Sequence, residues 1–504
     1  SEVDQIYREY TIAPGRIVVR GQKAQRNMQT ALRADFLLCY QFGQPLAVIE
    51  AKDNRHTVGA GIQQATEYAE RMGVPFAFAS NGDGFVFRDA TLADGQLIRE
   101  ISLDEFPSPQ DLWERYCAWK QWTPEQKKAN AFAYHQGDSN RVPRYYQLHA
   151  INRTLEAIAA GQNRVLLVMA TGTGKTYTAF QIIWRLLKSG AKKRILFLAD
   201  RNILVDQTKN NDFKPFGQAM TKIAKRQIDT SYEIYLSLYQ AVTGTDEEMN
   251  IYKQFSRDFF DLIVIDECHR GSAAEDSAWR EILDYFSNAT HVGLTATPVE
   301  MVSRSTCRLF GCDYKTPTAN YTLEDAVRDG NLAPFRVVTH TTKFMREGIK
   351  GHDLSDEQIA QLEDQGIDPN TLEFDGEDIN QAVYNKDTNR VILRNLMDKG
   401  IRDADGQLPG KSIIFARNIR HARLLAELFD ELYPQLAGKF CAVIHSDESR
   451  AEQLIDDFKG DGKNHDLTIA ISVDMLDTGI DVPEVVNLVF FKIVRSKAKF
   501  WQMV

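Results

Sequence analysis

Apolar runs and amphipathic stretches follow one another along the chain in an order that changes twice. Near the N-terminus, apolar runs at 34–40 and 46–52 flank a connection with glycine and proline, which predicts a β-hairpin. From about residue 141, nearly continuous apolar runs alternate with helical stretches, as in a parallel α/β sheet. A polar, acidic segment follows at 345–385, and a second α/β stretch begins near 411. The pattern predicts an α/β protein of several domains.

Length and composition narrow the class of protein. The chain has 504 residues, enough for about three domains. Its 43% hydrophobic and 26% charged residues are typical of soluble globular proteins. The segment SEVDQIYREY at the start does not have the pattern of a signal peptide, and no run approaches ~18 apolar residues. The six scattered cysteines form no CxxC pair, which argues against zinc and disulfides. We therefore expect a soluble, cytoplasmic protein that does not bind membranes.

The formal net charge of −9 argues against a protein that coats nucleic acid through bulk charge. A local basic channel is compatible with it, because affinity depends on the charges close to the phosphates. Two groups of basic residues are candidates, although a solvated surface is the simpler explanation of each. They are Arg16, Arg20, Lys23, Arg26 and Arg33, and Lys188, Lys192, Lys193 and Arg194.

The segment NRVLLVMATGTGKT, residues 163–176, carries the strongest local signal. Val165–Met169 has the composition of a strand buried on both faces, and 177–187 has helical periodicity. Between them, Gly172 and Gly174 allow a tight turn whose N–H groups face an anion at the helix N-terminus. The segment predicts a phosphate-binding loop, and a glycine-rich turn without a ligand is the alternative.

This loop is expected to bind ATP. Lys175 can meet the β- and γ-phosphates, and the Thr176 hydroxyl can bind Mg²⁺. Met169 stands where the general phosphate-loop pattern has glycine, and the seven residues that follow resemble the variant loop of superfamily 2 helicases and translocases. The expected nucleotide-binding residues are Thr171, Gly172, Thr173, Gly174, Lys175 and Thr176.

The second strand of the N-terminal hairpin ends in the sequence Glu50-Ala51-Lys52. Side chains two positions apart on a strand share a face, so Glu50 and Lys52 project together. Asp35, near the start of the partner strand, can reach the same place. Two carboxylates beside a lysine suit a divalent metal on a phosphodiester, with the carboxylates as ligands and the ammonium positioning the nucleophile. The alternative is an exposed ion pair at a sheet edge.

The hairpin and the helix expected after it resemble the PD-(D/E)xK nucleases, with Ala34 in place of the usual proline. Gln64 and Tyr68 match the Q-x-x-x-Y signature of RecB-type nucleases and type I restriction subunits. They lie one helical turn apart, so both can face the metal site or the DNA backbone. Glu9, expected on a first helix, is a candidate for an additional acidic residue, although a surface salt bridge is the simpler explanation.

Prolines and a polar run between 103 and 141 predict a helical connector that ends in a domain boundary near residue 140. Gln147 follows, just ahead of an amphipathic helix expected at 148–159. In superfamily 2 proteins a glutamine at this place recognises adenine, and a side-chain amide can donate and accept at the adenine edge. A polar residue at a helix start is the alternative.

The segment DLIVIDECH, residues 261–269, predicts a strand that delivers two acidic residues at its C-terminal end, where ligands bind in open α/β sheets. Asp266 is expected to hold Mg²⁺ with Thr176, and Glu267 to polarise the water that attacks the γ-phosphate. Other segments resemble further helicase motifs: motif Ia at 199–207, a DNA-contacting motif at 237–240 and motif III at 295–298.

The second α/β stretch contains MLDTGIDVP, residues 475–483, which resembles helicase motif V. The resemblance implies that Gly479 and Asp481 contact the nucleotide. Near Gln502 the sequence reaches the place where motif VI begins, and it stops before the arginines that act on the γ-phosphate in that motif. We therefore expect a fragment of a longer polypeptide that binds ATP but hydrolyses it poorly.

These features predict an N-terminal PD-(D/E)xK nuclease-like domain followed by two RecA-like parallel-sheet domains. The endonuclease-like domain with its helical connector is expected at 1–140. The ATP-binding RecA-like domain is expected at 141–330. The second RecA-like domain is expected at 331–504, truncated at motif VI and carrying the acidic insert at about 345–385.

This order of units resembles the restriction (R, HsdR) subunit of type I restriction-modification enzymes. The resemblance implies an ATP-dependent translocase on double-stranded DNA, a Mg²⁺-dependent endonuclease, and a complex with methylation (M) and specificity (S) subunits, of which S reads the target sequence. Two other classes stay open on the sequence alone. They are a DNA repair or recombination helicase-nuclease and a non-catalytic DNA-responsive scaffold.

Overall fold

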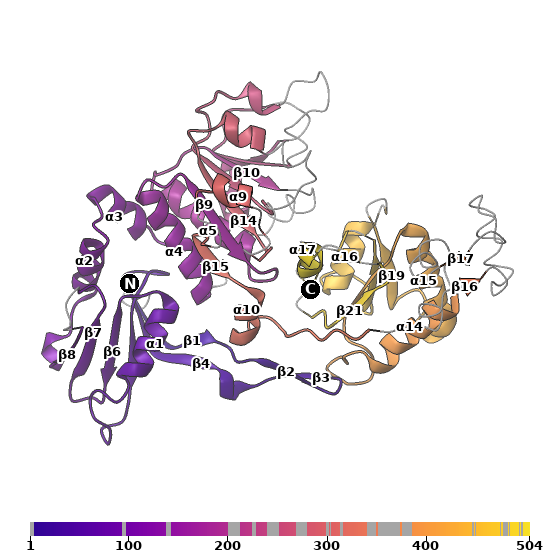
Figure 1. The fold of residues 1–504 in the computed structure, drawn as a ribbon, viewed down its shortest axis with the longest axis horizontal. Coiled ribbons are helices and arrows are strands. Elements are labelled where there is room, and N and C mark those ends of the chain that lie inside the picture. The colour runs from indigo at the N-terminus through magenta and orange to yellow at the C-terminus, as the bar shows by residue number, and fades with distance from the viewer. Residues whose placement is uncertain are drawn as a thin grey trace. The chain divides into compact units, whose positions relative to one another are not determined.

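The structure, a computed structural model of the chain, divides into two compact units (Figure 1). Unit 1 comprises Ser1–Arg16 and Arg26–Ala333, and unit 2 comprises Ile17–Gln25 and Pro334–Val504. The structure describes all residues except 1–4, 93–96, 138–142, 200–211, 224–227, 239–250, 269–279, 299–301, 303, 313–315, 340–348, 351–372, 375–385, 446–447, 449, 474, 477–481, 483, 493, 495–496 and 504. Most of the expected acidic insert at 345–385 lies outside the described residues.

Unit 1 begins with a mixed six-stranded sheet of order β1-β4-β5-β6-β7-β8. Its strands are β1 (Ile6–Ala13), β4 (Leu32–Cys39), β5 (Pro45–Ala51), β6 (Phe76–Ser80), β7 (Phe85–Asp89) and β8 (Ile98–Ile101). The predicted hairpin is confirmed, because β4 and β5 pair antiparallel. β5 and β6 pair parallel, so the chain must cross over between them, and helix α1 (Ile62–Met72) makes that crossover.

The helix expected around Glu9 is wrong. Glu9 lies in β1, which pairs antiparallel with β4, and its backbone has a positive φ of 47°. The segment is more stable as a strand, because it forms backbone hydrogen bonds with β4. An isolated helix of this length would be only marginally stable in water. Glu9 falls between the register pairs Arg8–Phe36 and Tyr10–Ala34, and therefore opposite Asp35.

Two capped helices lead from the mixed sheet to the next part of unit 1. α2 (Pro109–Trp119) and α3 (Pro124–Ala131) each begin with a proline after a serine or threonine cap. The helical connector predicted between 103 and 141 is therefore present. The following helix, α4, spans Tyr145–Ala159 and so begins earlier than the predicted residue 148. The reason is local, because the Gln147 side chain accepts a hydrogen bond from the Arg144 N–H and closes the first turn.

A seven-stranded, fully parallel sheet of order β11-β12-β10-β13-β14-β9-β15 forms the rest of unit 1 (Figure 1). The strands are β9 (Arg164–Met169), β10 (Ile195–Ala199), β11 (Met220–Lys222), β12 (Ile234–Leu238), β13 (Leu262–Ile265), β14 (Thr290–Thr295) and β15 (Ala319–Tyr321). The helices described after β9 in this part are α5 (Lys175–Lys188), α9 (Arg304–Leu309) and α10 (Leu323–Asp329). The predicted parallel α/β sheet is confirmed.

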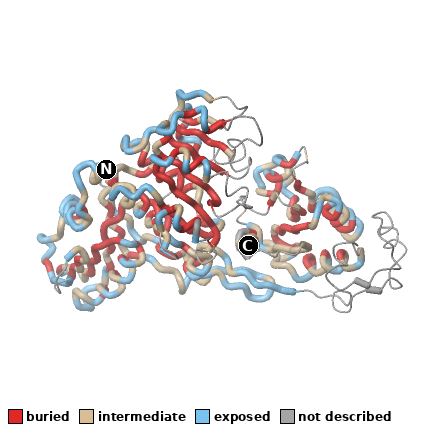
Figure 2. The backbone as a smooth tube through the Cα atoms, turned by 45° about the horizontal axis from the view of Figure 1, so that its top comes forward, coloured by how far each residue is buried: buried red, intermediate tan, exposed pale blue. Residues whose placement is uncertain are grey.

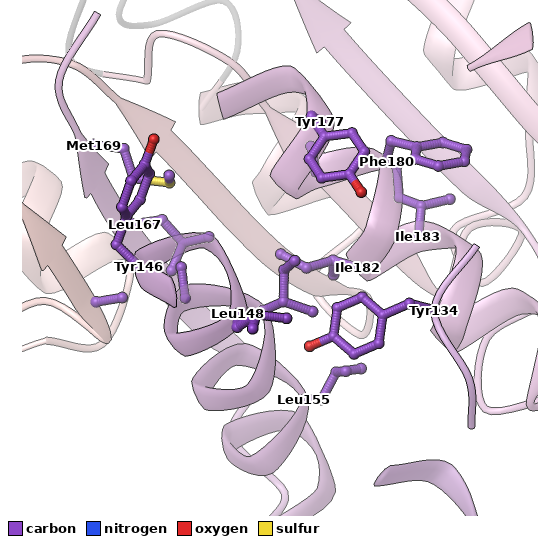
Figure 3. Close-up of a cluster of buried hydrophobic side chains, with 14 of the residues drawn as sticks. Tyr134, Tyr146, Leu148, Leu155, Leu167, Met169, Tyr177, Phe180, Ile182 and Ile183 are labelled. Atoms are coloured by element: carbon purple, nitrogen blue, oxygen red, sulfur yellow. The ribbon is translucent and has the colours of Figure 1, made fainter. Parts of the chain in front are cut away.

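One hydrophobic cluster joins the two sheets of unit 1. Leu37 and Val48 contribute from the mixed sheet, and Leu148 from α4, Leu167 from β9 and Ile182 from α5 continue the same cluster. Figure 3 shows the part of it in which α4 and α5 pack beside β9. In the burial view, the buried residues concentrate in the strands of the sheets (Figure 2). The two sheets are therefore parts of one packed body.

Unit 2 contains a parallel four-stranded sheet of order β19-β20-β18-β21. Its elements are β18 (Ser412–Phe415), β19 (Cys441–Ile444), β20 (Ile469–Ser472), β21 (Asn487–Phe490), α14 (Lys386–Lys399), α15 (Ile419–Leu432), α16 (Ala451–Lys459), α17 (Lys497–Met503) and the short pair β16 (Ile349–Lys350) and β17 (Glu373–Phe374). Among the described residues, no helix is both long enough and apolar enough to span a bilayer.

The hairpin β2 (Ile17–Arg20) and β3 (Lys23–Arg26) belongs to unit 2 for most of its length, although the strands on either side of it in the chain belong to unit 1. At its turn, Gln22 donates to the backbone carbonyls of Asp398 and Gly400 at 2.8 and 3.0 Å. Arg402 in turn donates its backbone N–H to the Gln22 carbonyl at 3.0 Å. These hydrogen bonds attach the hairpin turn to the end of α14.

Candidate active sites

The phosphate loop, residues 170–176, leaves the buried strand β9 and enters α5. Gly174 is the N-cap of α5 with φ 82°, in the left-handed region that side chains rarely adopt. A Cβ at this position would also collide with the Gln147 amide. Glycine is therefore required on both grounds, and the N–H groups of the first turn of α5 remain available to an anion.

Gln147 braces the loop from α4. Its Nε2 donates to the Thr173 carbonyl at 2.8 Å, and its Oε1 accepts from the Arg144 N–H at 2.9 Å. Thr173 is itself held by its hydroxyl, which donates to the Ala170 carbonyl at 2.6 Å. The oxygen and the nitrogen of the Gln147 amide thus both have hydrogen-bond partners. Adenine recognition by Gln147 stays a prediction, and it would require the amide to share or exchange one of these partners.

The acidic pair Asp266 and Glu267 follows the C-terminal end of β13, two strands away from β9 in the sheet. The two residues are 9% and 7% exposed, and Glu267 has a positive φ of 52°. The Glu267 N–H donates to Asp266 Oδ1 at 2.9 Å, which supports this unusual backbone conformation. Glu267 Oε1 lies 3.7 Å from Lys175 Nζ. The fold therefore brings together a lysine and a glutamate that are far apart in sequence.

This arrangement suits a nucleoside triphosphate. Lys175 is the first residue of the 14-residue helix α5, so its ammonium and the helix N-terminus offer positive charge to the same anion. Thr176 follows Lys175 in the first turn of α5, where its hydroxyl oxygen can bind Mg²⁺. Thr171 and Gly172 lie at the surface of the loop, while Thr173 is buried.

We define the hairpin cluster as Asp35 on β4, Glu50 on β5, Lys52 directly after β5, and Gln64 and Tyr68 on α1. The Phe36–Ile49 register pair places Asp35 directly opposite Glu50. Asp35 Oδ2 accepts a hydrogen bond from the Ala51 N–H at 2.7 Å, and Lys52 Nζ lies 3.6 Å from Glu50 Oε2. The two carboxylates and the ammonium that the sequence singled out are thus neighbours.

Helix α1 adds its polar face to the hairpin cluster. Lys52 donates to Gln64 Oε1 at 3.2 Å, and Gln64 Nε2 donates to the Tyr68 hydroxyl at 3.2 Å. The amide of Gln64 therefore connects the lysine of the hairpin with the tyrosine one helical turn along α1. Glu50, Lys52, Gln64 and Tyr68 thus form a continuous chain of polar contacts, and Asp35 lies opposite Glu50 at its end.

Within the hairpin cluster, Glu50 is the buried carboxyl group whose pKa is raised. It is 1% exposed, and its Oε1 is buried without a hydrogen-bond partner. Burial first, and then the charge of Asp35, raise the pKa of Glu50 to about 7, although Lys52 opposes the shift. A buried carboxylate oxygen without a partner costs free energy, and a cation would supply the missing partner. The donor set therefore fits a divalent, oxygen-preferring metal ion.

The described residues hold no group of three or more His, Cys, Asp or Glu side chains arranged to bind a metal. Asp35 and Glu50 are thus two carboxylates without a third in place. Glu9, opposite Asp35 on β1, is exposed and is the nearest acidic residue by strand register.

Several predicted residues cannot be placed. Gly479 and Asp481, expected to contact the nucleotide, lie outside the described residues, as does most of the motif Ia segment. In contrast, two residues that the sequence did not single out, the half-buried Arg71 and the buried Asp329, form an ion pair within unit 1. No local pattern marks this pair, because its members belong to elements that meet only in the folded protein.

Two protein families match the parallel-sheet regions of the chain. The family of type III restriction enzyme res subunits matches residues 140–300, and the helicase conserved C-terminal domain matches residues 392–504. Together they indicate a superfamily 2 helicase.

The EcoAI endonuclease subunit of a type I restriction enzyme from Escherichia coli is 47% identical over 99% of this chain, and the EcoKI subunit from strain K12 is 30% identical over 87%. The chain spans 60% and 39% of the length of these two relatives. A solved fragment from Vibrio vulnificus YJ016, described as an HsdR subunit, is 33% identical with a TM-score of 0.70, over 99% of this chain and 84% of the fragment. The chain therefore belongs to the family of endonuclease (HsdR) subunits of type I restriction enzymes.

Proposed function

We propose that this chain is the motor and cutting part of a type I restriction enzyme. It translocates double-stranded DNA with energy from ATP and cuts that DNA in a Mg²⁺-dependent reaction. It works in a complex with methylation (M) and specificity (S) subunits. The observation that carries the proposal is that the hairpin cluster and the phosphate loop belong to one compact unit of a chain in the HsdR family.

The motor half of the proposal assigns a role to each residue around the phosphate loop. Lys175 and the N-terminus of α5 bind the β- and γ-phosphates of ATP, and Thr176 with Asp266 would hold Mg²⁺. Glu267 orients and polarises the attacking water, since its carboxylate lies beside Lys175 at the C-terminal edge of the sheet. Gly479 and Asp481, which lie outside the described residues, are proposed to contact the nucleotide, as the resemblance of their segment to motif V implies.

The cutting half assigns roles to the hairpin cluster. Asp35 and Glu50 would hold a divalent cation, which when bound stabilises charge on the phosphodiester and lowers the pKa of its bound water. Lys52 is close enough to Glu50 to position the nucleophile. Gln64 holds Lys52 in place, and Tyr68 holds Gln64, so α1 sets the direction of the ammonium group.

Two alanine variants test the proposal in the complete enzyme with its M and S subunits. Lys175→Ala should abolish ATP hydrolysis, translocation and cutting together, because it removes the cation at the phosphates. Lys52→Ala should abolish cutting and leave ATP hydrolysis and triplex displacement unchanged. Cutting by the Lys52 variant, or strand separation in place of triplex displacement by the wild type, would contradict the proposed function.

A further inference from the structure

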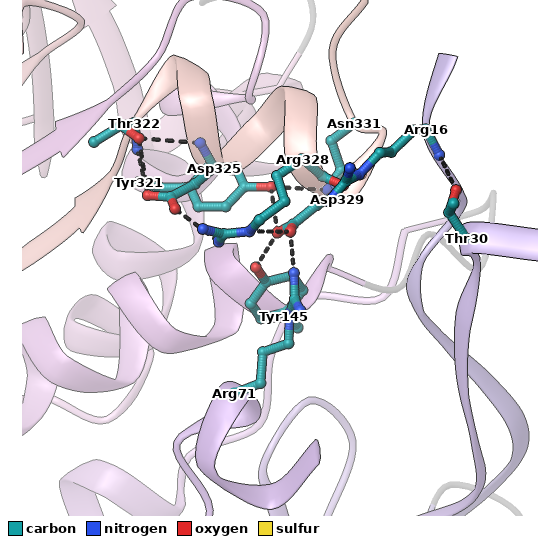
Figure 4. Close-up of polar contacts among 10 residues, drawn as sticks. All are labelled: Arg16, Thr30, Arg71, Tyr145, Tyr321, Thr322, Asp325, Arg328, Asp329 and Asn331. Carbon is teal, nitrogen blue, oxygen red and sulfur yellow. Dashed lines mark hydrogen bonds and ion pairs between the residues drawn. The ribbon is translucent and has the colours of Figure 1, made fainter. Parts of the chain in front are cut away.

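Asp329, the last residue of α10, is 1% exposed and is surrounded by donors. Its carboxylate accepts hydrogen bonds from the hydroxyls of Tyr145 and Tyr321, the latter at 3.0 Å, and pairs with the guanidinium of Arg71. Figure 4 shows these side chains converging on Asp329. Arg328 Nε also lies 3.4 Å from Asp329 Oδ1. A buried carboxylate is tolerated only while it stays paired, and these four partners satisfy Asp329.

One partner leads to the hairpin cluster. Arg71 lies in the last turn of α1, three residues after Tyr68 and on the same face. Gln64, one turn before Tyr68, accepts the hydrogen bond from Lys52. The ion pair of Arg71 with Asp329 therefore fixes the helix that directs Lys52.

The two tyrosine partners lead to the phosphate loop. Tyr145 begins α4 two residues before Gln147, which holds the Thr173 carbonyl. Tyr321 pairs with Met169 in the sheet, and its carbonyl accepts from the Ala170 N–H at 3.0 Å. Burial and then the hydrogen bond to Asp329 raise the pKa of Tyr145, so its hydroxyl stays a donor at neutral pH.

The turn after Asp329 is equally constrained. Gly330 has φ 75°, and a Cβ on it would collide with the backbone of Gly15 in the mixed-sheet part of unit 1. Arg26 Nη1 donates to the Gly330 carbonyl at 2.7 Å. Leu332 Cδ2 would lie 3.1 Å from a Cβ on Gly172 in the phosphate loop. The end of α10 thus touches both the mixed sheet and the loop.

We propose that Asp329 and Arg71 are positioning residues that couple nucleotide binding at the phosphate loop to the orientation of α1 at the cutting site. The inference rests on the proposed function. A shift of the loop on binding ATP moves the first residue of α4 and the end of β15, which both hold Asp329. Asp329 passes the shift through Arg71 to α1, so the nucleotide state regulates how Lys52 is presented.

Hydrogen exchange on the 504-residue chain tests this coupling. The probe is a non-hydrolysable ATP analogue with Mg²⁺, and its dissociation constant is measured in parallel by calorimetry. In the wild type, saturating analogue should change the exchange rates of the α1 amides, Ile62–Met72, by about fivefold or more. Arg71→Met should bind the analogue with an affinity within about twofold of the wild type and lose the response in α1.

Two further variants keep the test decisive. Tyr145→Phe removes one hydrogen bond to Asp329 at the opposite side and should also lose the response. Arg88→Met removes a different arginine pair of α1, with Glu70 at 3.0 Å, and should retain it. A purely structural role for Arg71 would lower the melting temperature and leave the response intact.

The outcomes separate the two proposals. Wild type that binds the analogue without any change in α1 overturns the coupling and leaves the ATP site standing. A response that persists in both Arg71→Met and Tyr145→Phe, or that disappears in Arg88→Met, also overturns the assigned route. Failure of the wild type to bind the analogue at all overturns the proposed function and the coupling with it.

Discussion

The two candidate sites of unit 1 contain the same pair of side chains at nearly the same distance. Glu267 and Lys175 are 3.7 Å apart at the phosphate loop, and Glu50 and Lys52 are 3.6 Å apart on the hairpin. The backbones that present them differ. Glu267 follows a parallel strand with a positive φ, whereas Glu50 lies within an antiparallel hairpin in ordinary strand conformation.

The difference lies in what surrounds the glutamate. At the loop, the helix N-terminus and the loop N–H groups are arranged for an anion. At the hairpin, Asp35 lies opposite Glu50 and adds a second negative charge, which favours a cation. The same ion pair can therefore belong to a phosphate-binding site or to a metal-binding site, and the neighbouring charges decide which.

The largest effects are expected from matched glutamate-to-glutamine variants, which should distinguish the phosphate loop from the hairpin cluster. Glu267→Gln should reduce ATP hydrolysis by about 10²–10⁴-fold while ATP still binds, because the water loses its polarising group. Glu50→Gln should reduce DNA cutting by a similar factor and leave ATP hydrolysis unchanged, as measured in the complete enzyme. Glu267→Gln should lose cutting as well, because cutting depends on the motor. Loss of ATP hydrolysis in Glu50→Gln would contradict the assignment of the hairpin cluster to cutting alone.

The raised pKa of Glu50 should make stability depend on pH. The folded-state pKa is about 7 against a reference of 4.5, so the contribution is present below pH 4.5 and is lost as pH rises through 7. Glu50→Gln should therefore gain up to about 3 kcal/mol in free energy of unfolding relative to the wild type between pH 4 and pH 8, measured in urea. Glu100→Gln, at an exposed position on β8, is the control. Parallel pH profiles of wild type and Glu50→Gln would refute the assignment.

Gly174→Ala should weaken nucleotide binding by about tenfold, because the left-handed backbone costs a side chain ~1–2 kcal/mol and the Cβ meets Gln147. Calorimetry with ATP analogue measures the effect. Gly190→Ala is a close control, since Gly190 has φ 79° but open space around it. It should lose similar stability and keep its nucleotide affinity, and equal affinity in both variants would argue against the role of the loop.

Divalent cation binding to the hairpin cluster should be the smallest of these effects and the most dependent on pH. A metal must displace the proton of Glu50, so Mn²⁺ should bind about fivefold or more tightly at pH 8 than at pH 6. Thermal shift with increasing Mn²⁺ measures the affinity. Asp266→Asn should keep this pH dependence and Asp35→Asn should lose it. The reverse result would place the cation at the phosphate loop.

Local patterns in the sequence were sufficient for much of this picture. Glu50 and Lys52 are two residues apart at the end of one strand, and the phosphate loop is a continuous segment, so each can be recognised from the sequence alone. The alternation of apolar runs and helical stretches predicts a parallel sheet, and the structure shows that this sheet has seven strands. These features depend on neighbours in the chain.

Features that depend on distant segments could not be predicted. Glu9 belongs to a strand because β4 is available to pair with it. Gln147 falls inside α4 because its own side chain caps the first turn. Asp329 and Arg71 have no local signal, since only the packing of the mixed sheet against the parallel sheet brings them together.

The attachment of the β2–β3 turn to α14 makes unit 2 a discontinuous domain. A polypeptide that starts at Pro334 would lack residues 17–25, and the carbonyls of Asp398 and Gly400 would lose the donor from Gln22. Recombinant expression of unit 2 alone therefore requires a circular permutation or a grafted peptide that restores the β2–β3 hairpin. A protease that cuts only near residue 333 would nick the chain and leave that attachment intact.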